Sequence, residues 1–495
     1  MIISREGKVS AITKEASVTT KNISTVVLLK IAQYPFLALA AMLIPRIMGP
    51  EVYGEYALLL SIIAITASLV SLGLTEIFGR FIPEFENRGE SANIKRLSSN
   101  FLTLKGAIDI ISCIILFLVL HFVFGDRFSD TYFLLIIAIL LANDWGYVPY
   151  SLLFGLNKLG KFASRDLIRR AMSLILILIL FHYYGLLGAI MSTLLVEVFF
   201  TALTFFWTRE YFRIEDFRVD WSFLKPYLSF GFIFYISWAL LNLWQRLGNP
   251  MIEYMTNDAT EVALFDIPNQ IFLLTATFTL VVICSFVPIF TKLLLAQKEA
   301  KLINWSSLIM KYTGILCTMI FWAYVLAGAD LIPIIIGSEY KDIFPNGIVL
   351  LLGIFPMIFA QLGILFSIVY KEPRRYFLAL CFAFSAFLLG SILLIPRYAS
   401  MGCSIATFIS CVVLALVIYI YFRDKFHLCL MDGLKTIALG LIFVPFLFIR
   451  GNLFTNLLLV VCSVLGYIVL LFVSRVLNLI EVREIFQAIR HRPQE

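Results

Sequence analysis

Fourteen apolar runs, each long enough to cross a lipid bilayer, fill most of this 495-residue chain. A spanning helix needs roughly 20 apolar residues, because it rises about 1.5 Å per residue through a hydrocarbon layer about 30 Å thick. Only 14% of the residues are charged, against about 25% in soluble domains. The sequence therefore predicts an all-α integral membrane protein with about 14 transmembrane helices. The predicted spans are residues 25–48, 53–82, 97–124, 131–156, 163–183, 186–208, 226–256, 262–291, 303–327, 344–370, 375–395, 401–422, 433–450 and 455–474.

The basic residues are unevenly divided between the two sides that these spans define. Counted with the charged ends of neighbouring spans, the even-numbered loops and both tails hold 30 of the 39 Lys and Arg residues, and the odd-numbered loops hold 5. Positively charged loops stay on the cytosolic side of a membrane. We therefore expect a multi-pass protein of the cytoplasmic (inner) membrane with both termini in the cytosol. The net charge of +7 follows from this topology, so no nucleic acid is expected as a partner.

The order of the spans predicts two related halves. The longest cytosolic loop, residues 209–225, follows six spans, and the similar sequences FIPEF (81–85) and FVPIF (286–290) end spans 2 and 8. Repeated halves with a pseudo-two-fold axis are common in transporters. The predicted parts are a cytosolic tail at 1–24, an N-lobe of spans 1–6 at 25–208, an inter-lobe loop at 209–225, a C-lobe of spans 7–12 at 226–422, an appended helix pair at 423–474 and a cytosolic tail at 475–495.

The segments outside the predicted spans offer no place for an enzyme. Apart from the tails, none exceeds about twenty residues, which is too short for a soluble catalytic domain. The sequence GLNKLGKF (155–162) has Phe162 where a nucleotide-binding loop needs Ser or Thr. The four histidines and eight cysteines lack metal-ligand spacing. We therefore expect no enzyme activity, no catalytic residues, no metal and no cofactor.

One predicted span carries a polar stripe within the sequence NLWQRLGNPMIEYM (242–255). Because of the helical spacing i, i+4, i+7 and i+11, four of its side chains lie on one face, and a fifth lies beside them. The four are Asn242, Arg246, Asn249 and Glu253, and the fifth is Gln245. Such a stripe avoids lipid and faces another helix or a water-filled cavity. Two interpretations stay open: Arg246 lines a transport cavity, or it pairs with a carboxylate that holds helices together.

Other polar residues lie inside predicted spans. Gly248 and Pro250 should bend the helix that carries the stripe. Polar side chains also occur in span 8 (Asp266, Asn269 and Gln270) and in span 1 (Lys30 and Gln33). Lys105 and Asp109, at i and i+4 in span 3, are interpreted as a local ion pair. Asp144 and Glu197 are buried acids for which the sequence indicates no partner.

The sequences IPRIMGPEVYGEYALLLSII (44–63) and GLTEIFGRFIPEF (73–85) resemble the polysaccharide flippases of the multidrug/oligosaccharidyl-lipid/polysaccharide (MOP) exporter superfamily. The resemblance is most specific over residues 25–100, and the arrangement of spans agrees over nearly the whole chain. It implies two six-helix lobes in a V around a central cavity, lined mainly by spans 1, 2, 7 and 8, with alternating access. The implied cargo is an oligosaccharide linked through pyrophosphate to a polyprenol, carried from the cytosolic to the outer leaflet.

With this cargo, the polar residues of spans 1, 7 and 8 acquire expected roles. A guanidinium can bind phosphate oxygens bidentately, and amides suit sugar hydroxyls. The expected substrate-binding residues are Arg246, Asn242, Gln245, Asn249, Lys30, Gln33, Gln270 and Asn269. Glu253 and Asp266 are expected to bind a coupling ion, either a proton or sodium. The expected partners are the lipid-linked glycan, the bilayer and the polysaccharide assembly machinery.

Two other functions stay open. An ion-coupled drug or cation exporter of the same superfamily would share the lobes but favour an acidic, aromatic cavity. An integral membrane polysaccharide polymerase or glycosyltransferase would act on the same lipid carrier, but such enzymes usually need a sizeable outer loop. The longest outer loop here, residues 328–343, is short and half apolar.

Overall fold

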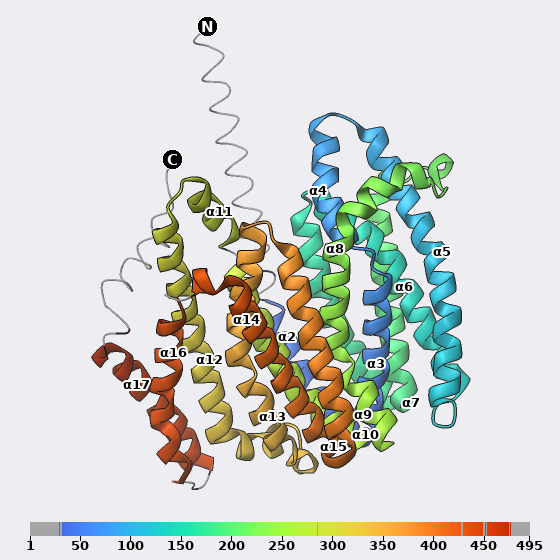
Figure 1. Ribbon diagram of the computed structural model, residues 1–495. Helices are drawn as coiled ribbons and strands as arrows, with labels where there is room; N and C mark the ends of the chain where they lie inside the picture. The colour runs from blue at the N-terminus through green and yellow to red at the C-terminus, as the bar shows by residue number, and fades with distance from the viewer. Residues whose placement is uncertain are drawn as a thin grey trace. The chain divides into compact units, whose positions relative to one another are not determined.

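The computed structural model describes residue 29 and residues 32–284, 286–426, 429–448, 451, 453–474 and 476. These residues form helices and contain no β-strand (Figure 1). The α-helices are α2 (Tyr34–Met48), α3 (Pro50–Val70), α4 (Leu74–Asn87), α5 (Ser91–Phe124), α6 (Asp130–Gly155), α7 (Leu159–Thr208), α8 (Trp221–Arg246), α9 (Gly248–Thr256), α10 (Ala259–Cys284), α11 (Val287–Leu295), α12 (Glu299–Ile335), α13 (Ile343–Leu352), α14 (Ile354–Val369), α15 (Pro373–Phe426), α16 (Cys429–Gly440) and α17 (Leu453–Val473). Short 3-10 helices are η1 (Arg209–Tyr211), η2 (Ile214–Asp216), η3 (Ser338–Tyr340) and η4 (Leu441–Phe448).

The chain divides into two compact units, Met1–Pro250 and Met251–Glu495. Helices α2 to α8 belong to the first unit, α10 to α17 belong to the second, and α9 crosses the boundary. Each unit is described by itself below. The residue bounds expected for the lobes, the inter-lobe loop and the appended pair stay a prediction.

The described helices confirm the predicted class, an all-α integral membrane protein. Nine helical segments of the described part are long and apolar enough to span a membrane, and α8 adds a tenth if its two bent halves count as one span. Within α8, the parts Trp221–Ile233 and Tyr235–Arg246 meet at an angle of 47°. Two of the nine segments, those of α7 and α15, are far longer than a single span.

Both long helices fold back on themselves. In α7, Arg169 Nε donates to Glu197 Oε1 at 2.9 Å, although 28 residues of straight helix would separate them by about 42 Å. The reversal lies at Gly185, whose φ of 58° and ψ of −142° are non-helical. In α15, Arg375 Nη1 donates to the carbonyl of Tyr421 at 2.9 Å across a non-helical Ala399. Each long helix therefore holds two of the predicted spans, while the full count of fourteen stays a prediction.

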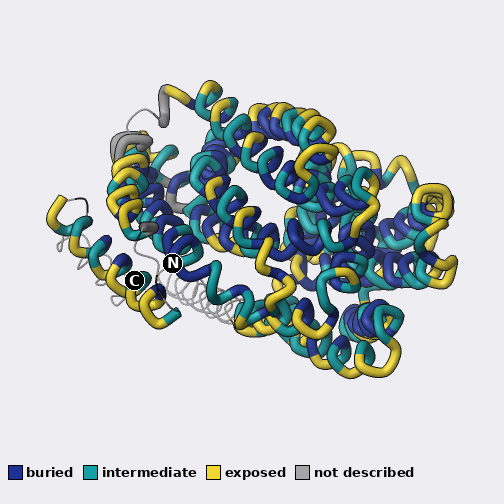
Figure 2. Tube along the Cα trace, turned by 90° about the horizontal axis from the view of Figure 1, so that it is seen from below, coloured by how far each residue is buried: buried dark blue, intermediate teal, exposed yellow. Residues whose placement is uncertain are grey.

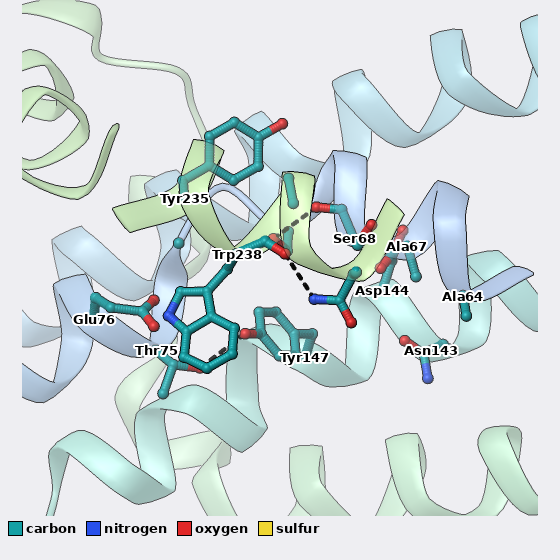
Figure 3. Close-up of a pocket in the computed structure, with 14 residues that line it drawn as sticks. Ala64, Ala67, Ser68, Thr75, Glu76, Asn143, Asp144, Tyr147, Tyr235 and Trp238 are labelled. Atoms are coloured by element: carbon teal, nitrogen blue, oxygen red, sulfur yellow. Dashed lines mark hydrogen bonds between the residues drawn. The ribbon is translucent and has the colours of Figure 1, made fainter. Parts of the chain in front are cut away.

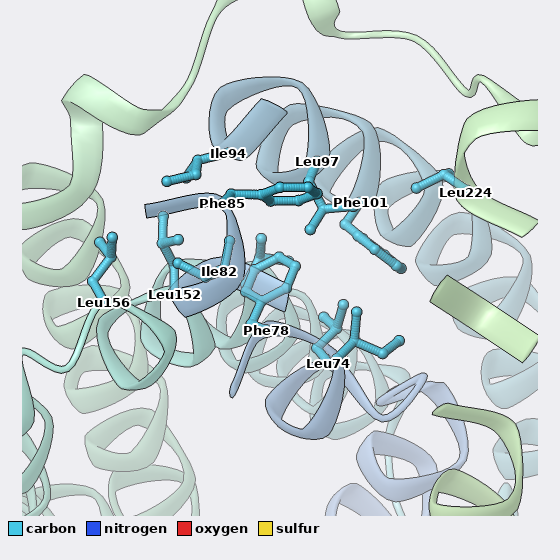
Figure 4. Packing of buried hydrophobic residues seen from close by; sticks show 12 residues of the cluster. Leu74, Phe78, Ile82, Phe85, Ile94, Leu97, Phe101, Leu152, Leu156 and Leu224 are labelled. Atoms are coloured by element: carbon cyan, nitrogen blue, oxygen red, sulfur yellow. The ribbon is translucent and has the colours of Figure 1, made fainter. Parts of the chain in front are cut away.

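A hydrophobic cluster holds α4, α5, α6 and α8 together in the first unit (Figure 4). Phe78 of α4 packs edge-on against Phe101 of α5, with ring centroids 5.6 Å apart. Gly155 of α6 lies so close to α4 that an added Cβ would stand 2.6 Å from the carbonyl oxygen of Phe78. The absence of a side chain at Gly155 lets the two helices approach.

Helix α5 has one exposed apolar side and one buried side. Ile111, Ile115 and Phe122 are exposed along one side, and Phe122 is 82% exposed. Cys113 and Leu120 are buried on the other side. Apolar side chains that are exposed along a spanning helix are suited to contact with lipid. Figure 2 shows the same alternation of buried and exposed turns along many helices.

Asp220 fixes the start of α8 next to α5. Its Oδ1 accepts hydrogen bonds from the Ser222 hydroxyl at 2.7 Å and from the backbone N–H of Phe223 at 3.2 Å, and its Oδ2 accepts from Arg96 Nη2 of α5 at 2.6 Å. These bonds, the one from Ser222 first, lower the pKa of Asp220 to about 2. The carboxylate therefore stays ionised at neutral pH and keeps its role as an N-cap.

Candidate functional site

A cavity of about 340 Å³ lies within the first unit, between α3, α4, α6 and α8 (Figure 3). Its carboxylates come from Glu76 of α4 and Asp144 of α6, and its amides from Asn143 of α6 and Asn242 of α8. Three aromatic side chains also line it: Tyr147, Tyr235 and Trp238. The cavity thus combines flat apolar rings with hydrogen-bonding groups, as ligand sites commonly do.

The break between α3 and α4 shapes one wall of this cavity. Leu72 and Gly73 adopt left-handed φ values of 55° and 64°. At Gly73 an added Cβ would also lie 3.1 Å from Tyr235 Cβ, so glycine permits both the turn and the close approach of α8. Directly after the break, the hydroxyl of Thr75 lies 2.8 Å from the Tyr147 hydroxyl, which joins α4 to α6.

A buried ion cluster adjoins the cavity. Lys105 Nζ lies 3.7 Å from Asp109 Oδ1 and 3.3 Å from Asp144 Oδ1, and it donates to the carbonyl of Val70 at 2.9 Å. The side chains of Lys105 and Asp109 are fully buried, and that of Asp144 is 3% exposed. The predicted pair of Lys105 with Asp109 is therefore present, and Asp144, for which no partner was expected, is its third member.

A second cluster contains several arginines of α7. Arg165 Nη1 lies 3.5 Å from Asp166 Oδ1, and its guanidinium lies 4.4 Å from the centre of the Tyr150 ring. Arg169 binds Glu197 through Nε at 2.9 Å and also through Nη2. Glu197, the other buried acid without an expected partner, is thus paired inside the α7 hairpin.

Arg246 and Arg170 differ from these paired arginines. Arg170 is exposed, Arg246 is half-buried, and their charges lie within electrostatic range of each other. In the described part of the chain, neither side chain has an ion pair or a hydrogen bond. The described residues therefore show no carboxylate partner for Arg246, and its pairing with a carboxylate and its place in a transport cavity both stay predictions.

The other predicted residues of the first unit have different positions. Asn242 lines the cavity, and its Nδ2 donates to the carbonyl of Trp238 at 2.9 Å. Asn249 is buried, and its Nδ2 donates to Ser61 Oγ at 2.8 Å, so it fastens α9 to α3 and does not line the cavity. Gln245 and Gln33 are half-buried and lie outside the cavity wall. Lys30 lies outside the described residues.

The polar stripe is interrupted at Leu247, between the end of α8 and the start of α9, close to the position where the sequence predicts a bend. Pro250 has no N–H to donate to the carbonyl of Arg246 four residues earlier, which accounts for the interruption. Arg246 is consequently the last residue of α8. The expected single stripe is divided between two helices.

The remaining predicted residues lie in the second unit. Glu253, Asp266 and Asn269 are buried. Asp266 Oδ2 accepts a hydrogen bond from Gln270 Nε2 at 2.6 Å, in keeping with their i, i+4 spacing on α10. The roles expected for these four residues, in ion coupling and in substrate binding, stay predictions.

The sequence analysis does not identify Arg170 or Trp238 as candidate site residues. Arg170 belongs to a group of arginines close to a loop that is predicted to be cytosolic, and the charge asymmetry of the loops accounts for that group without a further role. Trp238 looked like one aromatic residue among many in an apolar span. The spacing of both residues could have indicated a role in the site. Trp238 lies one helical turn before Asn242, and Arg170 follows Arg165 and Arg169, which are spaced i, i+4.

The profile of one protein family, described as polysaccharide biosynthesis protein, matches residues 19–294, which is more than half of the chain. The chain belongs to this family. Among curated proteins no match is found. The predicted membership in the MOP exporter superfamily is confirmed by the family match together with the fold.

Solved structures of the same fold are transporters. A lipid II flippase, MurJ, in an inward closed conformation aligns with a TM-score of 0.61 and 15% identity, over 91% of this chain and 100% of its own. An inward-facing multidrug resistance MATE family transporter of the MOP superfamily aligns with a TM-score of 0.56 and 16% identity, over 80% of this chain and 95% of its own. The Vibrio cholerae MATE transporter VcmN in its bent form aligns with a TM-score of 0.52 and 15% identity, over 82% of this chain and 98% of its own. At these identities the likeness establishes the fold: a multi-pass membrane protein with a flippase-like transporter architecture.

Proposed function

We propose that this protein is a flippase that moves a polyprenyl-pyrophosphate-linked oligosaccharide, the repeat unit of a surface polysaccharide, from the cytosolic to the outer leaflet by alternating access. The observation that carries the proposal is the pair formed by Arg170 and Arg246. Neither guanidinium has an ion pair or a hydrogen bond with a described residue, and the two lie in electrostatic range of each other. Arg246 follows Asn242, a residue of the cavity lining, by four positions on α8.

The charges near this pair favour an anionic cargo. Four arginines gather here, and Asp166 and Glu197 neutralise two of them, so two positive charges remain. A pyrophosphate that bridges a lipid and a sugar carries one negative charge on each phosphate. A guanidinium binds phosphate oxygens through two parallel hydrogen bonds, and the bonds are strong because both partners are charged. Binding the cargo would also relieve the repulsion between the two arginines.

The family match and the fold support the same proposal. The family is described as one of polysaccharide biosynthesis, and a flippase of lipid II, itself a lipid-linked molecule, shares the fold. We propose that the chain acts as a transporter and not as an enzyme, in the cytoplasmic membrane, with both termini in the cytosol and the polysaccharide assembly machinery as its partner.

Loss of this protein should leave one lipid-linked glycan on the cytosolic leaflet of the membrane. We would delete the gene in cells that make the polysaccharide, label the glycan from each side and identify the accumulated species. A cysteine in place of Ser222, in the first turn of α8 and within the predicted inter-lobe segment 209–225, should stay inaccessible to an impermeant thiol reagent in intact cells. Normal export of the polysaccharide without the protein would contradict the proposal.

Glu253 and Asp266 are proposed to link transport to a proton or sodium gradient. Both carboxylates are buried in the second unit, and a bound cation stabilises a buried carboxylate. The double variant Glu253→Gln, Asp266→Asn should flip the glycan at a rate that no longer depends on either gradient. An unchanged dependence in reconstituted vesicles would remove both residues from the coupling step.

A second candidate function is the export of organic cations. The observation that favours it is the cavity itself, since Glu76, Asp144 and three aromatic rings are groups that bind cations well. The arginine pair disfavours it, because a cationic cargo would be repelled there. A protein that lowers drug accumulation in cells but moves no lipid-linked glycan would establish this alternative.

A further inference from the structure

We propose that the cavity between α3, α4, α6 and α8 is a glycan subsite for the sugar next to the pyrophosphate, and that it accepts a neutral or amino sugar and rejects an acidic one. This inference rests on the proposed function and names the sugar class of the cargo. It is carried by the aromatic lining, the charge of the lining and the place of Arg246 relative to the cavity.

The size and lining of the cavity suit one sugar residue. Its volume of about 340 Å³ is near the lower end of the range for small-molecule sites, about 300–1,000 Å³. It is therefore too small for a whole oligosaccharide. Trp238, Tyr235 and Tyr147 offer flat apolar faces for the C–H side of a sugar ring. The amides of Asn143 and Asn242 can both donate to and accept from hydroxyl groups.

The charge of the lining determines which sugar fits. Among the described residues, the lining includes Glu76 and Asp144 and contains no Lys, Arg or His. Lys105, which lies next to Asp144, is fully buried and already engaged with Asp109, Asp144 and the carbonyl of Val70. A sugar carboxylate would therefore meet two carboxylates without a free cation, and like charges in a poorly solvated site repel strongly.

Asp144 and Glu76 are the carboxylates that the lining offers to a hydrogen-bond donor. Asp144 is 2% exposed and its Oδ2 has almost no accessible surface, so the half-buried Glu76 is the more accessible of the two. Sugar hydroxyls and the ammonium of an amino sugar are donors that a carboxylate can accept. An ammonium would also be attracted to the aromatic faces.

The order of Asn242 and Arg246 along α8 indicates which sugar of the cargo would occupy the cavity, namely the one next to the pyrophosphate. Asn242 lines the cavity, and Arg246 follows it by four residues, about 6 Å along the helix. A pyrophosphate bound by Arg246 and Arg170 would place the sugar attached to it at the cavity. The next sugars would extend away from both sites.

The test uses soluble trisaccharides that carry no pyrophosphate, so it does not depend on flipping. The protein in lipid nanodiscs would be mixed with maltotriose, the glucosamine trimer or the galacturonic acid trimer, and binding would be followed by saturation-transfer NMR. We expect signals from the first two sugars and none from the third. Trp238→Ala should weaken binding roughly tenfold, as truncation of an aromatic anchor does. Trp221→Ala, at an exposed position of the same helix, should not change it.

Removing one carboxylate gives a specificity test. Glu76→Gln should let the galacturonic acid trimer bind while maltotriose binds as before. Three results would each overturn the inference. The unaltered protein could bind acidic and neutral trimers equally, Trp238→Ala and Trp221→Ala could have equal effects on binding, or no sugar could give a signal. Binding of tetraphenylphosphonium in place of the sugars would assign the cavity to organic cations. A protein that discriminates among the sugars as expected but flips no lipid-linked glycan would keep the subsite and refute the proposed function.

Discussion

Arg246→Ala should lower the rate of glycan flipping at least roughly tenfold, while the amount of folded protein in the membrane stays normal. A hydrogen bond to a charged group contributes about 1.5–3 kcal/mol, and each 1.4 kcal/mol corresponds to a factor of ten. Arg246 has no ion pair in the described structure, so its removal leaves no buried carboxylate alone. Arg246→Lys should keep part of the activity, because it preserves the charge but loses the forked geometry.

The matched control for this prediction is Arg169→Ala. Arg169 is bound to the buried carboxylate of Glu197, so its removal should destabilise the protein by about 3–5 kcal/mol. The two variants therefore separate binding from folding. Membrane abundance, thermal stability and flipping in reconstituted vesicles would be measured for both. A stable Arg246→Ala protein with a normal flipping rate would defeat the assignment, and one that disappears from the membrane would indicate a structural role.

The sequence predicts most of the architecture because hydrocarbon thickness limits what a spanning segment can be. Hydropathy separates the two spans within α7 and within α15, although each pair forms one long helical element with a reversal at Gly185 or Ala399. The interruption after Arg246 is also predictable, since Pro250 removes one hydrogen bond of the helix. These features are local, so a single sequence contains the information.

The partners of the buried charges could not be predicted in the same way, because they depend on which helices are neighbours. Lys105 and Asp144 are 39 positions apart, and Arg169 and Glu197 are 28 positions apart. Hairpin geometry offers a partial signal, since residues at similar distances before and after a reversal lie opposite each other. Glu197 lies twelve residues after Gly185 and Arg169 lies sixteen before it. The cavity could not be predicted from such spacing, because its lining residues come from four separate helices.

Asn249 shows that a polar stripe can be divided between two helices. Helix α8 ends at Arg246, so Asn249 belongs to the next helix, α9. Asn249 then binds Ser61 of α3. A polar stripe is therefore a reliable guide to one shared face only as far as the next break of the helix.

Lys105→Met should cause the largest loss of stability, because it leaves Asp109 and Asp144 buried without the ammonium between them. Breaking a buried ion pair costs about 3–5 kcal/mol, a large part of the roughly 5–15 kcal/mol that stabilises a folded protein. The bond from Lys105 to the carbonyl of Val70 is lost as well. Unfolding in detergent and abundance in the membrane would measure the effect, with Lys161→Met, at an exposed position, as the control.

The triple variant Lys105→Met, Asp109→Asn, Asp144→Asn should recover most of the lost stability. A buried charge cluster that is replaced as a whole leaves no unpaired ion, and such replacements are often neutral or stabilising. Recovery in the triple variant would show that the instability of Lys105→Met comes from uncompensated charge, because the volume lost at Lys105 is the same in both. If Lys105→Met were no less stable than Lys161→Met, the three side chains would not form an ionised cluster in the folded protein.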